Sequence, residues 1–290
     1  MTDSGKQRDQ TDVEQFAEAL LAAVEEQLNL PDVSPSHAMA TAAMALLQLG
    51  IEFVRRYNRL DVRVESSALN GPVLFVANHG FGGIFDLNVF ATYAALEQLE
   101  LDRPVTALTH QLAWTLGVGP FIEPVGARPA SHDSAREAFG EGQHVLVFPG
   151  GDLDAAKTWH ERNQVVFGGR SGFARLAIEF GVPIVPIVTA GASESLLVIS
   201  RGERLARALR VDKLLRIKAL PLTVSLPWGV NVGAVGLLPY LPLPTKLDTR
   251  VLTAIHAEPD EEPDAYAERV QSAMQSALDE MTANRKPLLG

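Results

Sequence analysis

Cysteine is absent from this chain of 290 residues. Disulfide bonds, a thiolate nucleophile and zinc–thiolate sites are therefore excluded. The seven histidines show no spacing typical of a metal site, so no metal ligand is predicted. The sequence also contains no internal repeat, no Gly-x-Ser-x-Gly nucleophile motif and no glycine-rich phosphate-binding loop. These absences leave open a catalytic site built on histidine and carboxylate side chains.

Positive charge is also scarce, since the formal net charge is −10. This argues against a nucleic-acid partner. Residues 191–250 differ, with nine Lys or Arg against four Asp or Glu. A locally basic, apolar segment suits anionic lipid headgroups, although an ordinary solvated helix face is the alternative. Because Met1–Gln15 resembles neither a signal nor a transit peptide, we predict a cytoplasmic location with peripheral association to the cytoplasmic membrane.

The N-terminal part predicts a disordered tail over 1–12 and a helical segment over 13–60. Its two helices are expected at Val13–Leu28 and Ser36–Asn58, separated by prolines. The apolar part of the second helix, Ala38–Val54, falls short of the ~20 residues of a membrane span and contains a charge. We therefore expect this helix to pack on the domain or lie in a bilayer surface.

Strand and helix patterns alternate from residue 61, and one domain is predicted over 61–290. The pattern predicts an α/β fold with a largely parallel sheet flanked by helices. The expected strands are Asp61–Glu65, Val73–Ala77, Val105–Leu108, His144–Phe148, Ile184–Val188 and Arg250–His256. The expected helices are Phe85–Leu99, His110–Leu116, His132–Phe139, Gly172–Phe180 and Ala265–Asn284.

Two segments between residues 201 and 244 point towards lipid. Arg201–Lys218 has arginines spaced three apart and predicts a basic amphipathic helix. Thr223–Pro244 carries no charge and contains four prolines, which argues against a transmembrane helix. This second segment is expected to be either buried and irregular or an apolar loop that touches lipid.

A glycine-rich turn from Asn78 to Asp86 follows the strand predicted at Val73–Ala77. His79 and Asp86 flank this turn, as a catalytic base and its orienting carboxylate often do, although a structural loop histidine is the alternative. Along a straight helix the pair would lie ~10 Å apart. We therefore expect the glycines to curl the chain back, with a helix beginning near Ile84 and Asp86 in its first turn.

Four ordered segments together resemble the glycerolipid (lysophospholipid) acyltransferase superfamily, and especially its diacylglycerol-acyltransferase-like branch. They are Asn78–Asp86, Gly119–Arg128, Val145–Gly151 with its Phe-Pro-Gly-Gly turn, and Gly181–Ile187. The resemblance implies transfer of a fatty acyl group from acyl-CoA or acyl carrier protein to a hydroxyl of a glycerolipid or lysophospholipid. It makes His79 the general base and Asp86 its partner. The thioester is already activated, so no further cofactor is expected.

The predicted substrate-binding residues are Asn78, Arg128, Phe148, Pro149, Gly150, Gly151 and Arg170. Arg128 and Arg170 are candidates for binding phosphate, with ordinary surface arginines as the alternative. Six residues separate His79 from Asp86, where the commoner motif has four.

Gly150 stands where the commoner third motif has glutamate, and Asp152 and Asp154 follow it. A wider space and two carboxylates at the mouth favour an uncharged acceptor such as a mono- or diacylglycerol. The alternative is that both aspartates point to solvent. Two other functions stay open, a non-catalytic lipid-binding protein of the same fold and a thioesterase-like hydrolase.

Overall fold

The structure is a computed structural model that describes residues 35–65, 69–80, 86–115, 117–202, 207–208, 220–233 and 240–290. Its strands are β1 (Asp61–Val64), β2 (Leu74–Ala77), β3 (Val105–Thr109), β4 (Ala127–Pro129), β5 (His144–Val147), β6 (Ile184–Ala190), β7 (Leu197–Ser200), β8 (Leu222–Ser225), β9 (Gly229–Val232) and β10 (Asp248–Val251). Its α-helices are α2 (Pro35–Arg56), α3 (Leu87–Gln98), α4 (Leu112–Thr115), α5 (Gly119–Ile122), α6 (His132–Gly140), α7 (Gly151–Ala155), α8 (Gly172–Phe180) and α11 (Pro263–Thr282). Three 3₁₀ turns, η1 (Glu123–Val125), η2 (Trp159–Glu161) and η3 (Ala192–Glu194), complete the elements of the described residues.

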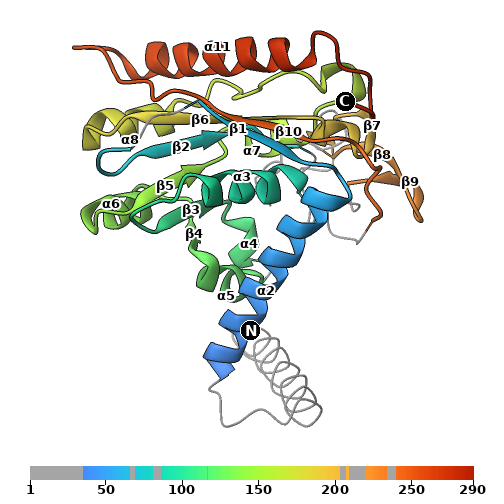
Figure 1. Cartoon of the computed structure of the whole chain (residues 1–290), viewed down its shortest axis with the longest axis horizontal. Helices are drawn as coiled ribbons and strands as arrows, with labels where there is room; N and C mark the ends of the chain where they lie inside the picture. The colour runs from blue at the N-terminus through green and yellow to red at the C-terminus, as the bar shows by residue number, and fades with distance from the viewer. Residues whose placement is uncertain are drawn as a thin grey trace.

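In the described part of the chain, seven strands form one sheet in the order β1-β10-β6-β2-β5-β3-β4 (Figure 1). The five strands from β6 to β4 are parallel, whereas β10 pairs antiparallel with β6 and parallel with β1. This topology confirms the predicted α/β fold with its largely parallel sheet. Because β2 lies between β5 and β6, the segments that follow these three strands meet at one edge of the sheet.

Alternate residues of the central strand β2 enter two different cores. Leu74 and Val76 pack with residues of α6, α8 and α11, and Phe75 packs on the other face with residues of α3. Figure 1 shows α11 and α3 on opposite sides of the sheet. A strand buried on both faces reads as an unbroken apolar run, which explains why β2 is recognisable in the sequence.

Some predicted boundaries differ from the structure. The last strand of the main sheet was expected at Arg250–His256, but β10 ends at Val251 and Ile255 makes only an isolated bridge to Ile184. The predicted tail 1–12, the helix Val13–Leu28 and most of the helix Arg201–Lys218 lie outside the described residues.

The segment Thr223–Pro244 was expected to be either buried and irregular or an apolar loop that touches lipid, and its first half instead contains two strands. β8 and β9 form an antiparallel hairpin, and β7 pairs with β8 to complete a second sheet. Pro227 lies in the turn between the two strands, where its missing N–H leaves the strand pairing intact. Residues 234–239 lie outside the described part.

Helix α2 projects away from the sheet (Figure 1). Its C-terminal end is anchored by the buried side chains of Ile51 and Val54. Within the described residues, His37–Arg56 is long and apolar enough to cross a bilayer by length and composition, and 11% of that window is buried. The expectation that the helix falls short of a span was therefore wrong on length, while the expected packing on the domain is present, against α3, α5 and η1.

Candidate active site

His79 and Asp86 are in direct contact. The Nδ1 atom of His79 lies 2.7 Å from Oδ2 of Asp86. His79 follows β2 by two residues, and Asp86 is the N-cap of α3 with an extended backbone conformation. The contact expected from the sequence is present. The expected start of the helix near Ile84 was wrong, because Asp86 precedes α3 and does not lie in its first turn.

The two carboxylate oxygens of Asp86 have different partners. Oδ1 accepts the backbone N–H of Asn88 at 2.9 Å, and Oδ2 faces the imidazole. A carboxylate only accepts, so the His79 proton is assigned to Nδ1 and the lone pair to Nε2. The His79 side chain is 19% exposed and that of Asp86 6%. A mostly buried imidazole with a fixed tautomer, whose lone pair is on Nε2, is suited to accepting a proton.

The turn after β5 lies beside this pair. The ring of Phe148 is tilted against the imidazole of His79, with 4.7 Å between their centroids. Nη1 of Arg170 donates to the carbonyl oxygens of Pro149 and Gly150. Phe148, Pro149, Gly150 and Arg170 are therefore brought together beside His79, as their predicted place in the site requires, although contact with substrate stays a prediction.

Gly150 has no room for a side chain. A Cβ atom there would lie 2.2 Å from Cβ of Asp154 and 2.3 Å from the carbonyl oxygen of Val166. The expectation that glycine in place of glutamate widens the site was wrong, since this volume is filled by the chain itself. Gly151 begins α7 with a positive φ of 49°, and a Cβ there would meet Arg170 at 2.7 Å.

Asp154 does not lie at the mouth of the site. Its side chain is 1% exposed and forms an ion pair of 2.8 Å with Lys157, which is equally buried. Both the predicted repulsion of phosphate by Asp154 and the alternative that it points to solvent were therefore wrong. The side chain of Asp152 lies outside the described residues.

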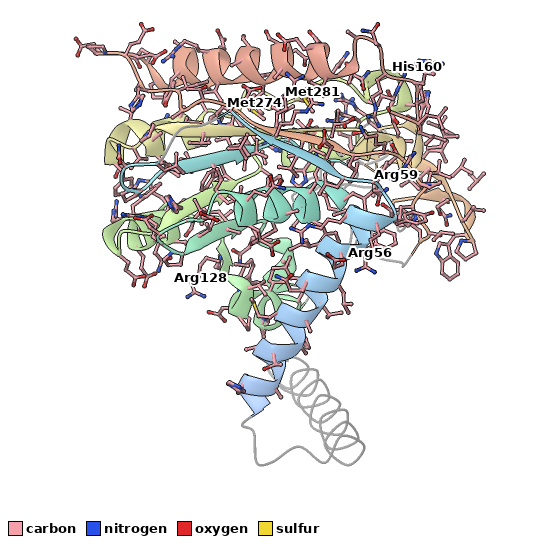
Figure 2. The ribbon with its side chains drawn as sticks, viewed as in Figure 1. Arg56, Arg59, Arg128, His160, Met274 and Met281 are labelled. Carbon is pink, nitrogen blue, oxygen red and sulfur yellow. The ribbon has the colours of Figure 1, made fainter. Side chains whose placement is uncertain are left out.

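Asn78 and Arg128 have partners within the protein. The Asn78 amide donates to the carbonyl of Thr189 and accepts its N–H, at 3.0 and 2.8 Å, so it joins the ends of β2 and β6. Arg128 pairs with Glu123 at 2.9 Å and is 45% exposed. Figure 2 shows Arg128 beside β4, on the side of the molecule away from α11. Substrate binding by either residue stays a prediction.

Tyr240 is a site residue that the sequence analysis did not single out. It is 5% exposed and packs with Leu196 and Val198. Burial, together with the nearby charge of Asp86, raises the pKa of its phenol, which stays protonated at neutral pH. Tyr240 belongs to the Pro-rich segment, and no local pattern links that segment to Asp86.

Lys157 was missed as well. Its spacing of three residues from Asp154 is one that brings side chains together on a helical turn, so the pair was detectable in principle. His144 is buried, and its Nδ1 accepts the N–H of Val73. Desolvation lowers the pKa of His144 to about 4, which keeps it neutral.

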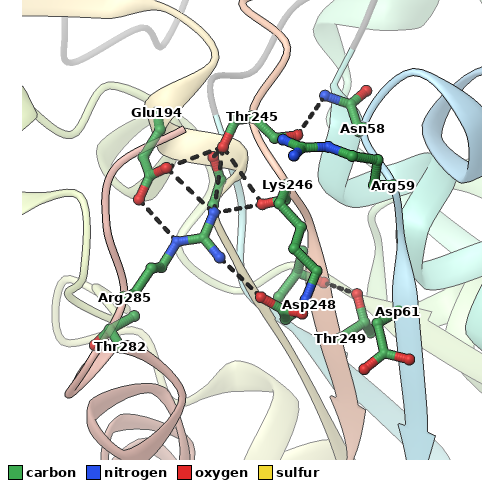
Figure 3. Close-up of polar contacts among 12 residues, drawn as sticks. Asn58, Arg59, Asp61, Glu194, Thr245, Lys246, Asp248, Thr249, Thr282 and Arg285 are labelled. Atoms are coloured by element: carbon green, nitrogen blue, oxygen red, sulfur yellow. Dashed lines mark hydrogen bonds and ion pairs between the residues drawn. The ribbon is translucent and has the colours of Figure 1, made fainter. Parts of the chain in front are cut away.

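A buried ionic network holds the connection after β6, next to the site (Figure 3). Nε of Arg285 donates to Glu194 at 2.9 Å and Nη1 to Asp248 at 2.8 Å. The Arg285 and Glu194 side chains are only 3% and 2% exposed. The same connection contains Ala192, against which a Cβ on Gly80 would lie at 2.9 Å. The C-terminal end therefore supports the turn that carries His79.

Comparison with known proteins identifies several relatives. Residues 52–190 match the family model described as Acyltransferase. An uncharacterised protein of Mycobacterium tuberculosis is 26% identical over 244 residues, which cover 81% of this chain and 64% of that protein. Chloroplastic phytyl ester synthase 1 of Arabidopsis thaliana is 30% identical over 128 residues, or 43% of this chain and 18% of the relative. The chain thus spans 64% of the length of its mycobacterial relative.

Among solved structures, the 1-acyl-sn-glycerophosphate acyltransferase PlsC of Thermotoga maritima aligns with 96% of this chain and 100% of its own. The sequence identity is 15% and the TM-score 0.47.

Proposed function

Because residues 52–190 match the family model described as Acyltransferase, we propose that the protein transfers a fatty acyl group from an acyl thioester to a lipid hydroxyl, with His79 as general base. The observation that carries the proposal is the 2.7 Å contact between His79 and Asp86. Acyl-CoA or acyl carrier protein would be the donor.

In this reaction the Nε2 lone pair of His79 takes the acceptor proton while the hydroxyl oxygen attacks the thioester carbonyl. Asp86 fixes the tautomer and stabilises the imidazolium that forms. When the tetrahedral intermediate collapses, the new C–O bond is kept and the C–S bond breaks. The imidazolium then returns its proton to the leaving thiolate, so His79 ends neutral and no covalent enzyme intermediate is needed.

We further propose that the acceptor hydroxyl belongs to an uncharged lipid, such as a mono- or diacylglycerol. The cations near the turn after β5 have partners in the protein, since Arg170 donates to two carbonyls and Lys157 is buried against Asp154. Arg128 is engaged with Glu123 on an exposed edge. A related sequence is named as a synthase of phytyl esters, that is, esters of an uncharged alcohol. The proposal of a neutral acceptor therefore rests on these engaged cations and on this relative, because Asp154 is buried and does not lie at the mouth of the site.

One assay distinguishes the candidate functions. Purified protein is incubated with radiolabelled acyl-CoA, or acyl carrier protein, and equimolar monoacylglycerol, lysophosphatidate and a long-chain alcohol. We expect labelled neutral lipid. Labelled free fatty acid alone would indicate the thioesterase-like hydrolase, and no product would indicate a lipid-binding protein. Preferential labelling of lysophosphatidate would contradict the neutral acceptor while leaving acyl transfer in place.

We also propose peripheral attachment to the cytoplasmic membrane through the outer face of the second sheet. Residues opposite one another in antiparallel strands share a face. Leu197, Val224 and Val230 form one such row, and Leu222 and Val232 a second. Of these, Val230 is 68% and Val232 48% exposed, and Trp228 in the turn is 47% exposed. An uncharged aliphatic face with a tryptophan at its tip suits insertion into a bilayer surface.

Replacing both Val230 and Val232 with serine is expected to weaken vesicle binding at least about tenfold, because two aliphatic side chains no longer leave water. Co-sedimentation with vesicles that contain anionic lipid measures this. Phe121→Ser, at a residue 47% exposed in α5, which Figure 1 shows away from β7, β8 and β9, is the matched control and should leave binding unchanged. Equal binding by wild type and the double variant would exclude this face as the attachment surface.

A further inference from the structure

Two oppositely charged side chains are buried directly behind His79. Asp154 lies in α7 and Lys157 just after it, each side chain is 1% exposed, and Nζ of Lys157 lies 2.8 Å from Oδ1 of Asp154. Removing two charges from water is costly, and replacing such a pair by apolar residues often leaves stability unchanged or improves it. The acid–base chemistry of His79 and Asp86 does not use this pair. Its contacts indicate what it does instead.

Both peptide groups of His79 are bonded to this ion pair. The backbone N–H of His79 donates to Oδ2 of Asp154 at 2.6 Å, and Nζ of Lys157 donates to the carbonyl oxygen of His79 at 3.1 Å. These charge-assisted bonds are stronger than bonds between neutral groups. They hold the backbone on both sides of the His79 Cα atom, although the partners are more than 70 residues away in sequence.

The remaining groups of the pair are satisfied by a third segment. Oδ1 of Asp154 accepts the N–H of Val166 at 3.1 Å, and Nζ of Lys157 donates to the carbonyl of Gln164 at 2.8 Å. All three ammonium protons therefore have an acceptor, two carbonyls and the carboxylate. A fully bonded buried network of this kind is rigid, and its geometry is transmitted to His79.

We infer that Asp154 and Lys157 are positioning residues that fix the direction of the His79 imidazole, which the contact to Asp86 alone does not do. The inference rests on the proposed function, in which Nε2 of His79 has to meet the acceptor hydroxyl. The backbone N and C atoms determine where the Cα–Cβ bond points, and so the base from which the ring extends. A bond from Asp86 to Nδ1 still permits the ring to tilt about that contact. When both peptide groups of His79 are also held, the position of Nε2 is fixed. Small displacements of reacting atoms reduce the rate by large factors.

The test compares Lys157→Met with the double variant Asp154→Asn/Lys157→Met. Lys157→Met leaves the buried carboxylate of Asp154 without its counter-charge, so the double variant is expected to be less destabilised. It keeps an oxygen that can accept the His79 N–H but removes both charges and the bond to the His79 carbonyl. We expect kcat to fall about 10- to 100-fold in folded double variant, with a smaller change in KM for the acyl donor.

The second readout does not depend on turnover. The Nδ1 proton of His79, held by Asp86, gives a downfield ¹H NMR signal that is identified by its loss in His79→Ala. We expect this signal to shift and broaden in the double variant. Phe139→Ala is the control, because Phe139 packs on Phe180 where α6 and α8 lead into the amino ends of β5 and β6, whereas His79 follows the carboxyl end of β2, so this core substitution should alter neither kcat nor the signal.

A folded double variant with a wild-type signal, or with wild-type kcat, would overturn the inference. An equal loss in Phe139→Ala would also overturn it, because the effect would then reflect stability alone. If wild-type protein transfers no acyl group at all, the proposed function fails, and the NMR comparison still decides whether Asp154 and Lys157 hold His79.

Discussion

Replacement of His79 by alanine is expected to reduce turnover by about 10²–10⁴-fold while the protein stays folded. The reason is the loss of the only base whose lone pair is oriented by Asp86, through the 2.7 Å contact of Nδ1. The rate of labelled ester formation at saturating donor measures the effect. Circular dichroism of the same preparation verifies folding.

Asp86→Asn tests the role of the Asp86 charge more selectively than Asp86→Ala would. Asp86 caps α3 by accepting the N–H of Asn88 at 2.9 Å, and asparagine caps helices about as well as aspartate. The substitution therefore removes the charge behind the imidazole and leaves the helix start intact. Turnover should fall at least about tenfold. His160→Ala, at an exposed histidine, serves as the control. Near-normal turnover of folded His79→Ala would rule out the base assigned here.

Arg285→Met is expected to lower the free energy of unfolding by about 3–5 kcal/mol, because it leaves Glu194 charged, buried and without its guanidinium. Arg285 also donates to Asp248, to the hydroxyl of Thr245 and to the carbonyl of Lys246 (Figure 3). Urea denaturation at pH 7 gives the difference.

The double variant Glu194→Gln/Arg285→Met separates a stranded charge from lost packing. It should be less destabilised than Arg285→Met alone, since no buried carboxylate is left unpaired at position 194. Arg136→Met removes a solvent-exposed pair with Asp133, 58% and 91% exposed, and should cost at most about 1 kcal/mol. If Arg136→Met and Arg285→Met lowered the free energy of unfolding by similar amounts, burial of the ion pair would not explain the effect of Arg285→Met.

The sequence was sufficient for the elements that carry their own signal. β2 and β5 are short runs of apolar residues bounded by turn formers, and both are buried on both faces. α8 was predicted with its observed bounds, because its apolar periodicity ends at Gly181, which adopts a left-handed conformation. The pairing of His79 with Asp86 was predictable for a similar reason, since both residues and the turn that joins them lie within nine positions.

What the sequence could not provide depends on which distant segments become neighbours. The sequence does not predict the hairpin of β8 and β9, because prolines interrupt strands. Pro227 is compatible with the hairpin because it occupies the turn. Asp154 was placed at the mouth because it follows a glycine pair in a turn. Its burial follows from the direction of α7, which points the carboxylate at the His79 backbone. Tyr240 lies close enough for the charge of Asp86 to raise its pKa, and it is held by packing on Leu196 and Val198, which no local pattern predicts.

The close contact at Gly150 also makes two positions evolutionarily dependent on each other. Since a Cβ at position 150 would lie 2.2 Å from Cβ of Asp154 and 2.3 Å from the carbonyl oxygen of Val166, a glutamate introduced there clashes unless residue 154 loses its Cβ and the backbone at Val166 also shifts. Shrinking residue 154 alone removes the carboxylate that accepts the His79 N–H. Each single exchange is therefore disfavoured in the background of the other residue, which is sign epistasis. Interconversion between the Phe-Pro-Gly-Gly turn and its glutamate-containing counterpart requires position 154 and the backbone at Val166 to change together with position 150, and mutational libraries that vary one position at a time will not cross between them.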